Sequence, residues 1–96
     1  MDGMSPADFQ RDKGEWAEKT FPQSTKAGIV EHLKTEVDEL LESNAPEEGA
    51  DCLLLLLHHA HKCGYDLYEE ARKKHEINKT RKWGAPNEKG FCEHVK

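Results

Sequence analysis

The sequence predicts an all-α protein in which four helices form one domain, residues 1–96. Charged residues make up 34% of the chain and apolar residues 35%, a balance more typical of a solvated helical protein than of a β-sandwich. Aromatic residues are only 7%, and no stretch alternates apolar and polar residues for the length of a strand. A chain of 96 residues is also the size of one domain.

The first helix is predicted to cover residues 6–19. Ser5 can cap its start, and Pro6 fits the first helical position, where no backbone N–H is needed. A loop should follow, because Pro22 disfavours the helical conformation of the residue before it. The side chains expected to face inward are Phe9, Trp16 and Ala17.

The second helix is predicted to run from a cap at Ser24 or Thr25 to about residue 43. Its apolar stripe comprises Ile29, Val30, Leu33, Val37, Leu40 and Leu41. The acids on the opposite side, where water solvates them, are Glu31, Asp38 and Glu42. Glu36 instead borders the stripe, with His32 and Glu39 on the same flank. A carboxylate at the boundary of a core is costly without a partner, so this placement indicates a function.

The third helix is predicted to begin at Pro46 and to end before Gly64. Its apolar residues cover nearly every side: Cys52, Leu53, Leu54, Leu55, Leu56, Leu57, Ala60 and Cys63. Such a helix needs neighbours on nearly every side, and 96 residues cannot supply them all. The sequence therefore predicts a homo-oligomer that packs this helix between chains.

Asp66 is expected to cap a fourth helix over residues 67–82, which the segment 83–86 (WGAP) ends. Its inward face should mix apolar residues with Lys74, Asn78 and Arg81. Residues 87–96 are predicted to form a short helix or an ordered arm.

Charge, apolar runs and cysteines exclude several classes of function. The net charge of −5 argues against general binding to nucleic acid or to an anionic membrane. The longest apolar run, residues 53–57, is too short to cross a bilayer. Three cysteines without a C-x-x-C pair, and no signal peptide, predict a cytoplasmic protein. A zinc site at His58, His59 and His61 is not expected, because adjacent helical side chains diverge by about 100°.

Two acidic pairs lie on consecutive helices, separated by the breaker at residues 43–46. Glu36 with Glu39, and Glu48 with Asp51, are three residues apart and so point the same way on a helix. If the two helices are antiparallel, four carboxylates converge, and such a set suits Mg²⁺ or Mn²⁺. The alternative is a solvated acidic surface.

The fourth helix offers the opposite charge. Lys74, Asn78 and Arg81 are either salt-bridge partners of those acids or a clamp for triphosphate oxygens, with Arg81 suited to bidentate contact. Acids with metals opposite a cationic face are what cleavage of a metal-bound polyphosphate requires. His58 is interpreted either as a residue behind the metal ligands or as a surface histidine.

The chain resembles the MazG-like superfamily of all-α NTP pyrophosphohydrolases in the order of its motifs. These are E-x-x-E, a breaker and then E-x-x-D on a leucine-rich helix. Longer segments look like its small dATP/dGTP diphosphohydrolase branch, whose phage members are called MazZ. These segments are EWAEKTFP at 15–22, GIVEHLKTEVDEL at 28–40, EEGADCLLLLL at 47–57, KKHEINKTRKWG at 73–84 and EHVK at 93–96. The resemblance covers nearly the whole chain.

The resemblance implies roles for particular residues. The metal-binding acids would be Glu36, Glu39, Glu48 and Asp51, and the phosphate-contacting residues would be Lys74, Asn78 and Arg81. His32 and Trp16 sit where related proteins build the nucleoside pocket. The superfamily often has an extra glutamate before its first E-x-x-E, where this chain has Thr35. The implied fold is a four-helix MazG-like bundle completed by dimerisation, often as a dimer of dimers.

The predicted function is Mg²⁺- or Mn²⁺-dependent hydrolysis of a purine deoxynucleotide, dGTP or dATP, with GTP as a further candidate, to the monophosphate and pyrophosphate. Glu39, with Glu36 beside it, is the expected acceptor of the attacking water's proton. Two alternatives stay open. One is the same chemistry on pyrimidine or damaged dNTPs, and the other is a non-catalytic helical interaction module. The expected partners are the nucleotide and one or three further copies of the chain.

Overall fold

The computed structural model describes residues 3–96, and its regular elements are four helices. They are α1 (Pro6–Thr20), α2 (Lys26–Ser43), α3 (Pro46–Cys63) and α4 (Leu67–Lys79). Within the described residues there is no strand, only an isolated antiparallel bridge between Trp83 and His94. The prediction of an all-α fold with four helices is confirmed. None of these helices is long and apolar enough to span a membrane.

Local signals fix where the helices begin and end. The side chains of Ser5, Thr25 and Asp66 each accept the backbone N–H three residues on, at 3.1, 2.9 and 3.1 Å. Asn44 and Gly64 follow α2 and α3 in the left-handed conformation, with φ of 54° and 84°. These contacts satisfy backbone groups that a helix terminus leaves without partners.

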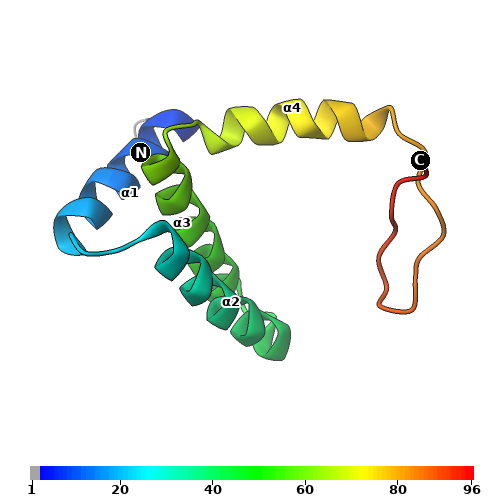
Figure 1. Cartoon of the computed structure of the whole chain (residues 1–96), viewed down its shortest axis with the longest axis horizontal. Coiled ribbons are helices and arrows are strands. Elements are labelled where there is room, and N and C mark those ends of the chain that lie inside the picture. The colour runs from blue at the N-terminus through cyan, green and yellow to red at the C-terminus, as the bar shows by residue number, and fades with distance from the viewer. Residues whose placement is uncertain (1–2) are drawn as a thin grey trace.

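The first three helices pack together at one end of the molecule, with α3 in contact with both α1 and α2 (Figure 1). The fully or nearly fully buried apolar side chains are Ala17, Ile29, Leu57 and Ala60. The crossing of α1 over α3 is close at Gly14, where an added Cβ would collide with the His61 ring. Phe9 and Trp16, expected inside, are 38% and 53% exposed, because the small residues of α1 face α3 instead.

The buried side chain of Gln10 ties α1 to the turn between α3 and α4. Its Nε2 donates to the carbonyl of Tyr65 at 2.6 Å, and its Oε1 accepts the backbone N–H of Leu67 at 2.9 Å. Both backbone groups lie at the start of α4. Gln10 therefore fixes the direction in which α4 leaves the first three helices.

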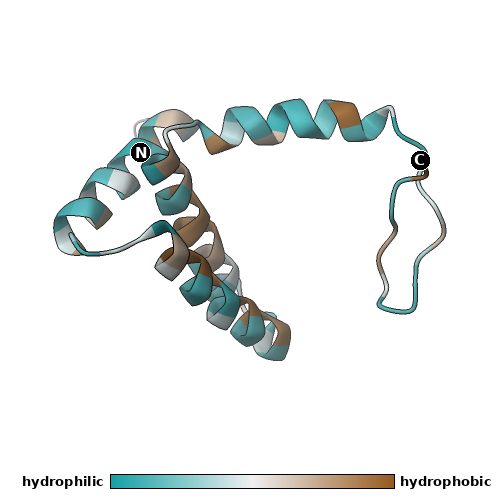
Figure 2. Cartoon of the chain, viewed as in Figure 1, coloured by the Kyte–Doolittle hydropathy of each residue, from teal (hydrophilic) through white to brown (hydrophobic). Residues whose placement is uncertain are grey.

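Helix α4 leads away from the other three and contacts α1 and α3 but not α2 (Figure 1). It ends at Lys79, three residues before the predicted end, and none of its residues is buried. The expected inward face of α4 therefore has no neighbour within one chain. Figure 2 shows the contrast in hydropathy, with α3 largely apolar and α4 mostly polar.

Residues 80–96 form an ordered arm beyond α4 rather than a helix. Trp83 Nε1 donates to the carbonyl of Asn78 at 2.9 Å, and the Trp83 ring meets the His94 ring edge-on at 5.9 Å. The backbone N–H of Val95 donates to the carbonyl of Lys82 at 2.7 Å. These contacts bring the two ends of the arm together.

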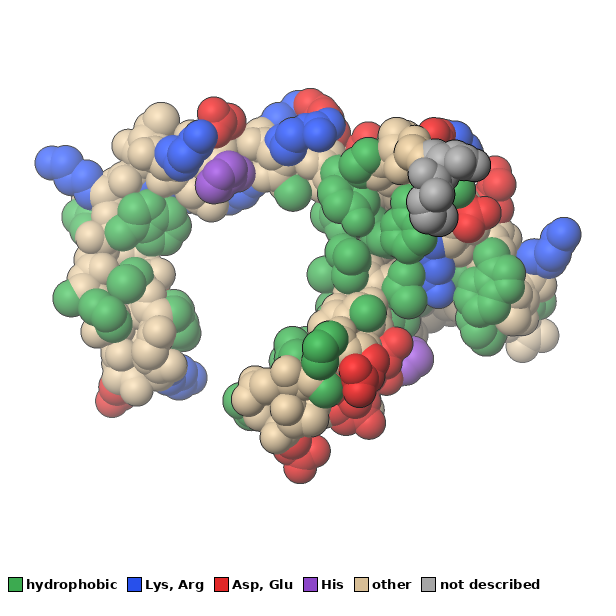
Figure 3. Space-filling model, turned by 180° about the vertical axis from the view of Figure 1, so that it is seen from behind, with side chains coloured by type: hydrophobic (Ala, Val, Ile, Leu, Met, Phe, Trp, Pro, Cys, Tyr) green, Lys and Arg blue, Asp and Glu red, His purple; other side chains and the backbone are tan. Residues whose placement is uncertain are grey.

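Many large apolar side chains are exposed on α2, α3 and the arm. Leu41 is 78% exposed, and the others at 37% or more are Val30, Val37, Leu53, Leu56, Trp83, Phe91 and Val95. In the space-filling view the chain is an open C with hydrophobic side chains along parts of its inner edge (Figure 3). Apolar surface of this extent is typical of a face that another molecule covers.

Candidate metal and nucleotide site

Three of the four predicted metal-binding acids converge between α2 and α3. Glu36, Glu39 and Glu48 each offer a carboxylate oxygen, and these oxygens lie within 4.8 Å of one another. The short connection at 44–45 makes this possible, because the left-handed Asn44 turns the chain so that α3 packs beside α2. Helical i, i+3 spacing then places Glu36 and Glu39 on the same side of α2.

Carboxylates this close repel one another, and the pKa values of Glu36 and Glu48 reflect it. The pKa of Glu36 is raised, first by the hydrogen bond that its protonated form makes with Glu39, then by burial and by the negative charges of Glu39 and Asp51. The pKa of Glu48 is raised mainly by burial, and further by the charges of Glu39, Asp51 and Glu47. Without cations, Glu36 and Glu48 therefore hold protons more tightly than ordinary glutamates.

The donor set fits a divalent cation. One oxygen of Glu36, Oε2, is buried and has no hydrogen-bond partner among residues 3–96. A buried carboxylate oxygen without a partner is costly, and a bound cation would remove that cost. Three hard oxygen ligands at this separation suit Mg²⁺ or Mn²⁺.

Asp51, the fourth predicted acid, lies beside this group rather than within it. It is exposed, and its charge raises the pKa values of both Glu36 and Glu48. Asp51 and Glu36 both line a cavity of about 430 Å³ that extends from the acids towards α1. A cavity of that size is typical of a small-molecule site.

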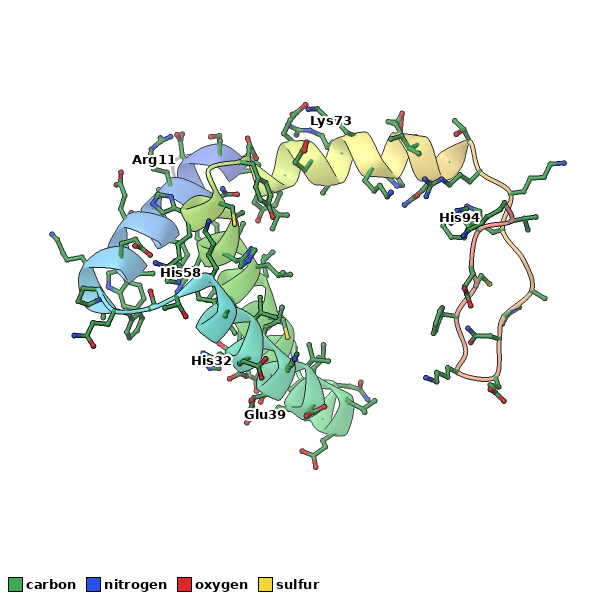
Figure 4. The ribbon with its side chains drawn as sticks, in the orientation of Figure 1. Arg11, His32, Glu39, His58, Lys73 and His94 are labelled. Atoms are coloured by element: carbon green, nitrogen blue, oxygen red, sulfur yellow. The ribbon has the colours of Figure 1, made fainter. Side chains whose placement is uncertain are left out.

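The predicted nucleoside residues, Trp16 and His32, both line the same cavity. His32 Nε2 lies 3.2 Å from Oε1 of Glu36, so His32 connects the cavity wall to the acids. Trp16 meets the Phe21 ring edge-on at 5.6 Å and forms an aromatic end with it. Figure 4 shows His32 and Glu39 on α2 and His58 on the neighbouring α3.

The structure adds cavity residues that the sequence analysis did not assign. Lys13 lines the cavity, with its Nζ 4.8 Å from the centroid of the Trp16 ring. Ser24 also lines it, and its Oγ is buried without a hydrogen-bond partner in the described chain. The spacing of Lys13 and Trp16, three residues apart on α1, is the one signal that could have placed Lys13 here.

His58 is a buried cavity residue, 3% exposed, so its interpretation as a surface histidine is wrong. Its Nε2 lies 2.6 Å from Oε2 of Glu18 on α1, and Lys62 Nζ lies 3.0 Å from the same oxygen. Hydrogen bonds from His58 and then Lys62 lower the pKa of Glu18. The three side chains join α1 to α3 behind the cavity.

Lys74, Asn78 and Arg81 are not brought to the acids of the same chain. None of them lines the cavity, and α4 has no contact with α2. Figure 4 shows Lys73 on α4 far from Glu39 and His32 on α2. Arg81 Nη1 donates to Oδ1 of Asn78 at 3.2 Å, within the cationic group itself. Among residues 3–96 no ion pair joins these residues to the four acids, so their interpretation as salt-bridge partners is wrong within one chain.

Comparisons with known proteins agree with the predicted resemblance. A family model for dATP/dGTP pyrophosphohydrolase matches residues 9–96. A dATP/dGTP diphosphohydrolase of Cyanophage S-2L is 33% identical over 92 residues, which are 93% of this chain and 87% of that protein. A dATP/dGTP diphosphohydrolase of Salmonella phage PMBT28 is 35% identical over 91 residues, and the match spans 31% of its length.

A solved structure matches nearly the whole fold. It is the Cyanophage S-2L MazG-like pyrophosphohydrolase bound to dGDP and three catalytic Mn²⁺ ions per active site. The TM-score is 0.82 at 32% identity, and the match covers 96% of this chain and 94% of the other.

Proposed function

Because this chain belongs to the dATP/dGTP pyrophosphohydrolase family, we propose that it hydrolyses dGTP or dATP to the monophosphate and pyrophosphate with Mg²⁺ or Mn²⁺. GTP is a further candidate substrate. The convergence of Glu36, Glu39 and Glu48 beside a cavity of nucleoside size is the observation that carries the proposal. The binding of dGDP and Mn²⁺ by the solved S-2L protein supports it.

The metal ligands would be Glu36, Glu39 and Glu48, joined by Asp51 at the cavity wall. Divalent cations bound there would neutralise phosphate charge and activate the attacking water. The buried, unpartnered Oε2 of Glu36 supports this role, because a purely solvated acid would have no such oxygen. The same observation favours an enzyme over a non-catalytic helical module.

Within the reaction, Glu39 accepts the proton of the water that attacks the α-phosphorus, with Glu36 beside it. Glu39 is the more exposed of the two, so water reaches it readily. As the new P–O bond forms, the bond from the α-phosphorus to the bridging oxygen breaks and pyrophosphate departs. Trp16 holds the nucleoside at the α1 end of the cavity, and His32 contacts it from the wall beside Glu36.

The phosphate contacts come from a second copy of the chain. Lys74 and Asn78 lie on α4 and Arg81 just beyond its end, and α4 leads away from the first three helices, so their reach is towards another subunit. The exposed apolar side chains of α2 and α3, Leu41 above all, support a homodimer or homotetramer. Arg81 and Lys74 would then neutralise the charge that develops on the departing pyrophosphate.

The test is pyrophosphate release from a panel of dNTPs and GTP with Mg²⁺ or Mn²⁺. Glu36→Gln and Asp51→Asn should each lower kcat/KM by about 100-fold, the size of effect seen when one charge-stabilising group is lost. Glu42→Gln, on the same helix but exposed and outside the cavity, is the matched control and should retain activity.

Two outcomes of that panel would overturn the proposal. Faster turnover of pyrimidine or damaged dNTPs would favour the house-cleaning alternative. Absence of turnover together with no divalent-dependent thermal shift would favour the interaction module.

A further inference from the structure

The cavity holds one cationic side chain that the proposed mechanism does not use. Among the residues that line it, Lys13 on α1 is the only lysine or arginine. Its ammonium forms no hydrogen bond or salt bridge within residues 3–96, unlike Lys34 or Lys62. Lys13 is half-buried, so its position is set by packing as well as by water.

The surroundings place this ammonium between the two ends of the cavity. On one side it lies over the face of Trp16, 4.8 Å from the ring centroid. On the other side it is near enough to Asp51 for the carboxylate charge to act on it, although the two form no ion pair. Burial lowers the pKa of Lys13 and the Asp51 charge opposes that change. A cation in such a half-desolvated position binds an anion strongly.

We infer that Lys13 binds the α-phosphate of the nucleotide. This inference rests on the proposed function, in which the acids and their cations hold the phosphates and Trp16 holds the nucleoside. With the base against Trp16 and the outer phosphates at the cations, the part of a nucleotide that lies between is the sugar with the α-phosphate. Of these only the phosphate is anionic, so it is the group that the unpaired ammonium would contact.

A contact to the α-phosphate predicts which ligands lose affinity when Lys13 is replaced. An α-phosphate contact is present in every deoxynucleotide, so loss of Lys13 weakens dGMP and dAMP binding equally. The nucleoside alone has no phosphate and does not depend on Lys13. A lysine that instead reads an oxygen of guanine would affect dGMP and spare dAMP.

The test is calorimetric binding of dGMP, dAMP and deoxyguanosine to the full chain with Mn²⁺ present. Lys13→Met, and Lys13→Gln as a second variant, should raise the Kd of both monophosphates about tenfold, the effect of one charge-assisted hydrogen bond. Lys13→Arg should retain most of the affinity, and deoxyguanosine binding should stay unchanged. Lys19→Met, the same change at an exposed site on α1, is the matched control.

Unchanged monophosphate binding in Lys13→Met would overturn the inference, as would a loss confined to dGMP. A failure of the proposed function is distinguishable from either result. If wild-type protein releases no pyrophosphate but its Kd for dGMP depends on Lys13, hydrolysis is overturned and the phosphate contact stands. If wild type hydrolyses dNTPs and Lys13→Met binds dGMP normally, only the Lys13 inference falls.

Discussion

The first three helices and the segment from α4 onward differ in how the chain stabilises them. In α1–α3, side chains distant in sequence meet, as Glu18 on α1 and His58 on α3 do across 40 residues. In α4 no residue is buried, and its charges are paired locally at i, i+3, including Arg72 with Glu69 and Lys73 with Glu70. Such pairs stabilise a solvated helix only slightly.

The two regions also differ in charge at the positions that matter for function. None of the four predicted metal-binding acids forms an ion pair with a lysine or arginine in the described chain, and Lys74 and Arg81 have no acidic partner there. The first region holds the acids and the second holds the cationic residues, but within one chain the two groups do not meet. The difference supports the proposal that the acids come from one chain and the phosphate contacts from a second copy.

The largest effect should come from separating the two halves. Arg81→Ala should lower kcat/KM by about 100-fold, as loss of a charge-stabilising group does, while Arg72→Ala, paired with Glu69 on the same helix, should have little effect. Co-refolding Arg81→Ala with Glu36→Gln should restore activity, because each mixed dimer contains one site with intact acids and an intact Arg81. Random pairing in a two-fold dimer gives about one quarter of wild-type activity.

If the mixture recovers no activity, the proposal that Arg81 acts on the acids of a second chain is contradicted. Arg81 would then act on the acids of its own chain or have no part in the site.

A second prediction compares packing in the two regions. Leu57→Ala should lower the free energy of unfolding by about 2–5 kcal/mol, because it removes a fully buried side chain from the core. Ile77→Ala on α4, where the side chain is 48% exposed, should cost less than about 1 kcal/mol in the monomer. Urea unfolding at low protein concentration measures the free energy of unfolding of both variants. Equal losses of stability would show that α4 has a core of its own.

Gln10 tests the junction between the regions. Gln10→Ala leaves the carbonyl of Tyr65 and the N–H of Leu67 without their partner, which should cost about 1–3 kcal/mol. Hydrogen exchange should increase first at the start of α4, because that is where the two bonds end. Gln23→Ala, on an exposed loop residue, is the control. Exchange that increases only in α1 would contradict the role of Gln10 as the tie to α4.

The smallest effect concerns the stability of the metal-free protein. The pKa of Glu36 is raised in the fold from its ordinary value of 4.5, so its protonated form favours the folded state. That contribution is present below pH 4.5 and is lost as the pH rises through the folded pKa. Glu36→Gln should therefore raise Tm at pH 7, with a difference that shrinks as the pH falls towards 4.5. A Tm difference that is independent of pH would contradict this origin.

The sequence predicts what depends on neighbours along the chain. The caps at Ser5, Thr25 and Asp66, and the end of α3 at Gly64, were all predictable because each acts within a few residues. The convergence of the acids was predictable as well, since i, i+3 spacing and one short breaker bring them together.

What the sequence did not predict depends on pairs distant in the chain. The direction of α4 comes from Gln10, whose partners lie 55 and 57 residues away. The burial of His58 comes from Glu18, 40 residues away. No local pattern encodes these two contacts.

The early end of α4 has a local cause that the sequence analysis missed. The indole N–H of Trp83, five residues on, donates to the carbonyl of Asn78 and so competes with a further helical turn.

The most direct test of the central claim is calorimetric binding of Mn²⁺ to the nucleotide-free protein. We expect wild type to bind Mn²⁺, Glu36→Gln and Glu48→Gln each to weaken binding at least about tenfold, and Glu42→Gln to bind as wild type does. Binding by Glu36→Gln and Glu48→Gln that matches wild type would contradict the claim that these carboxylates form a divalent-cation site.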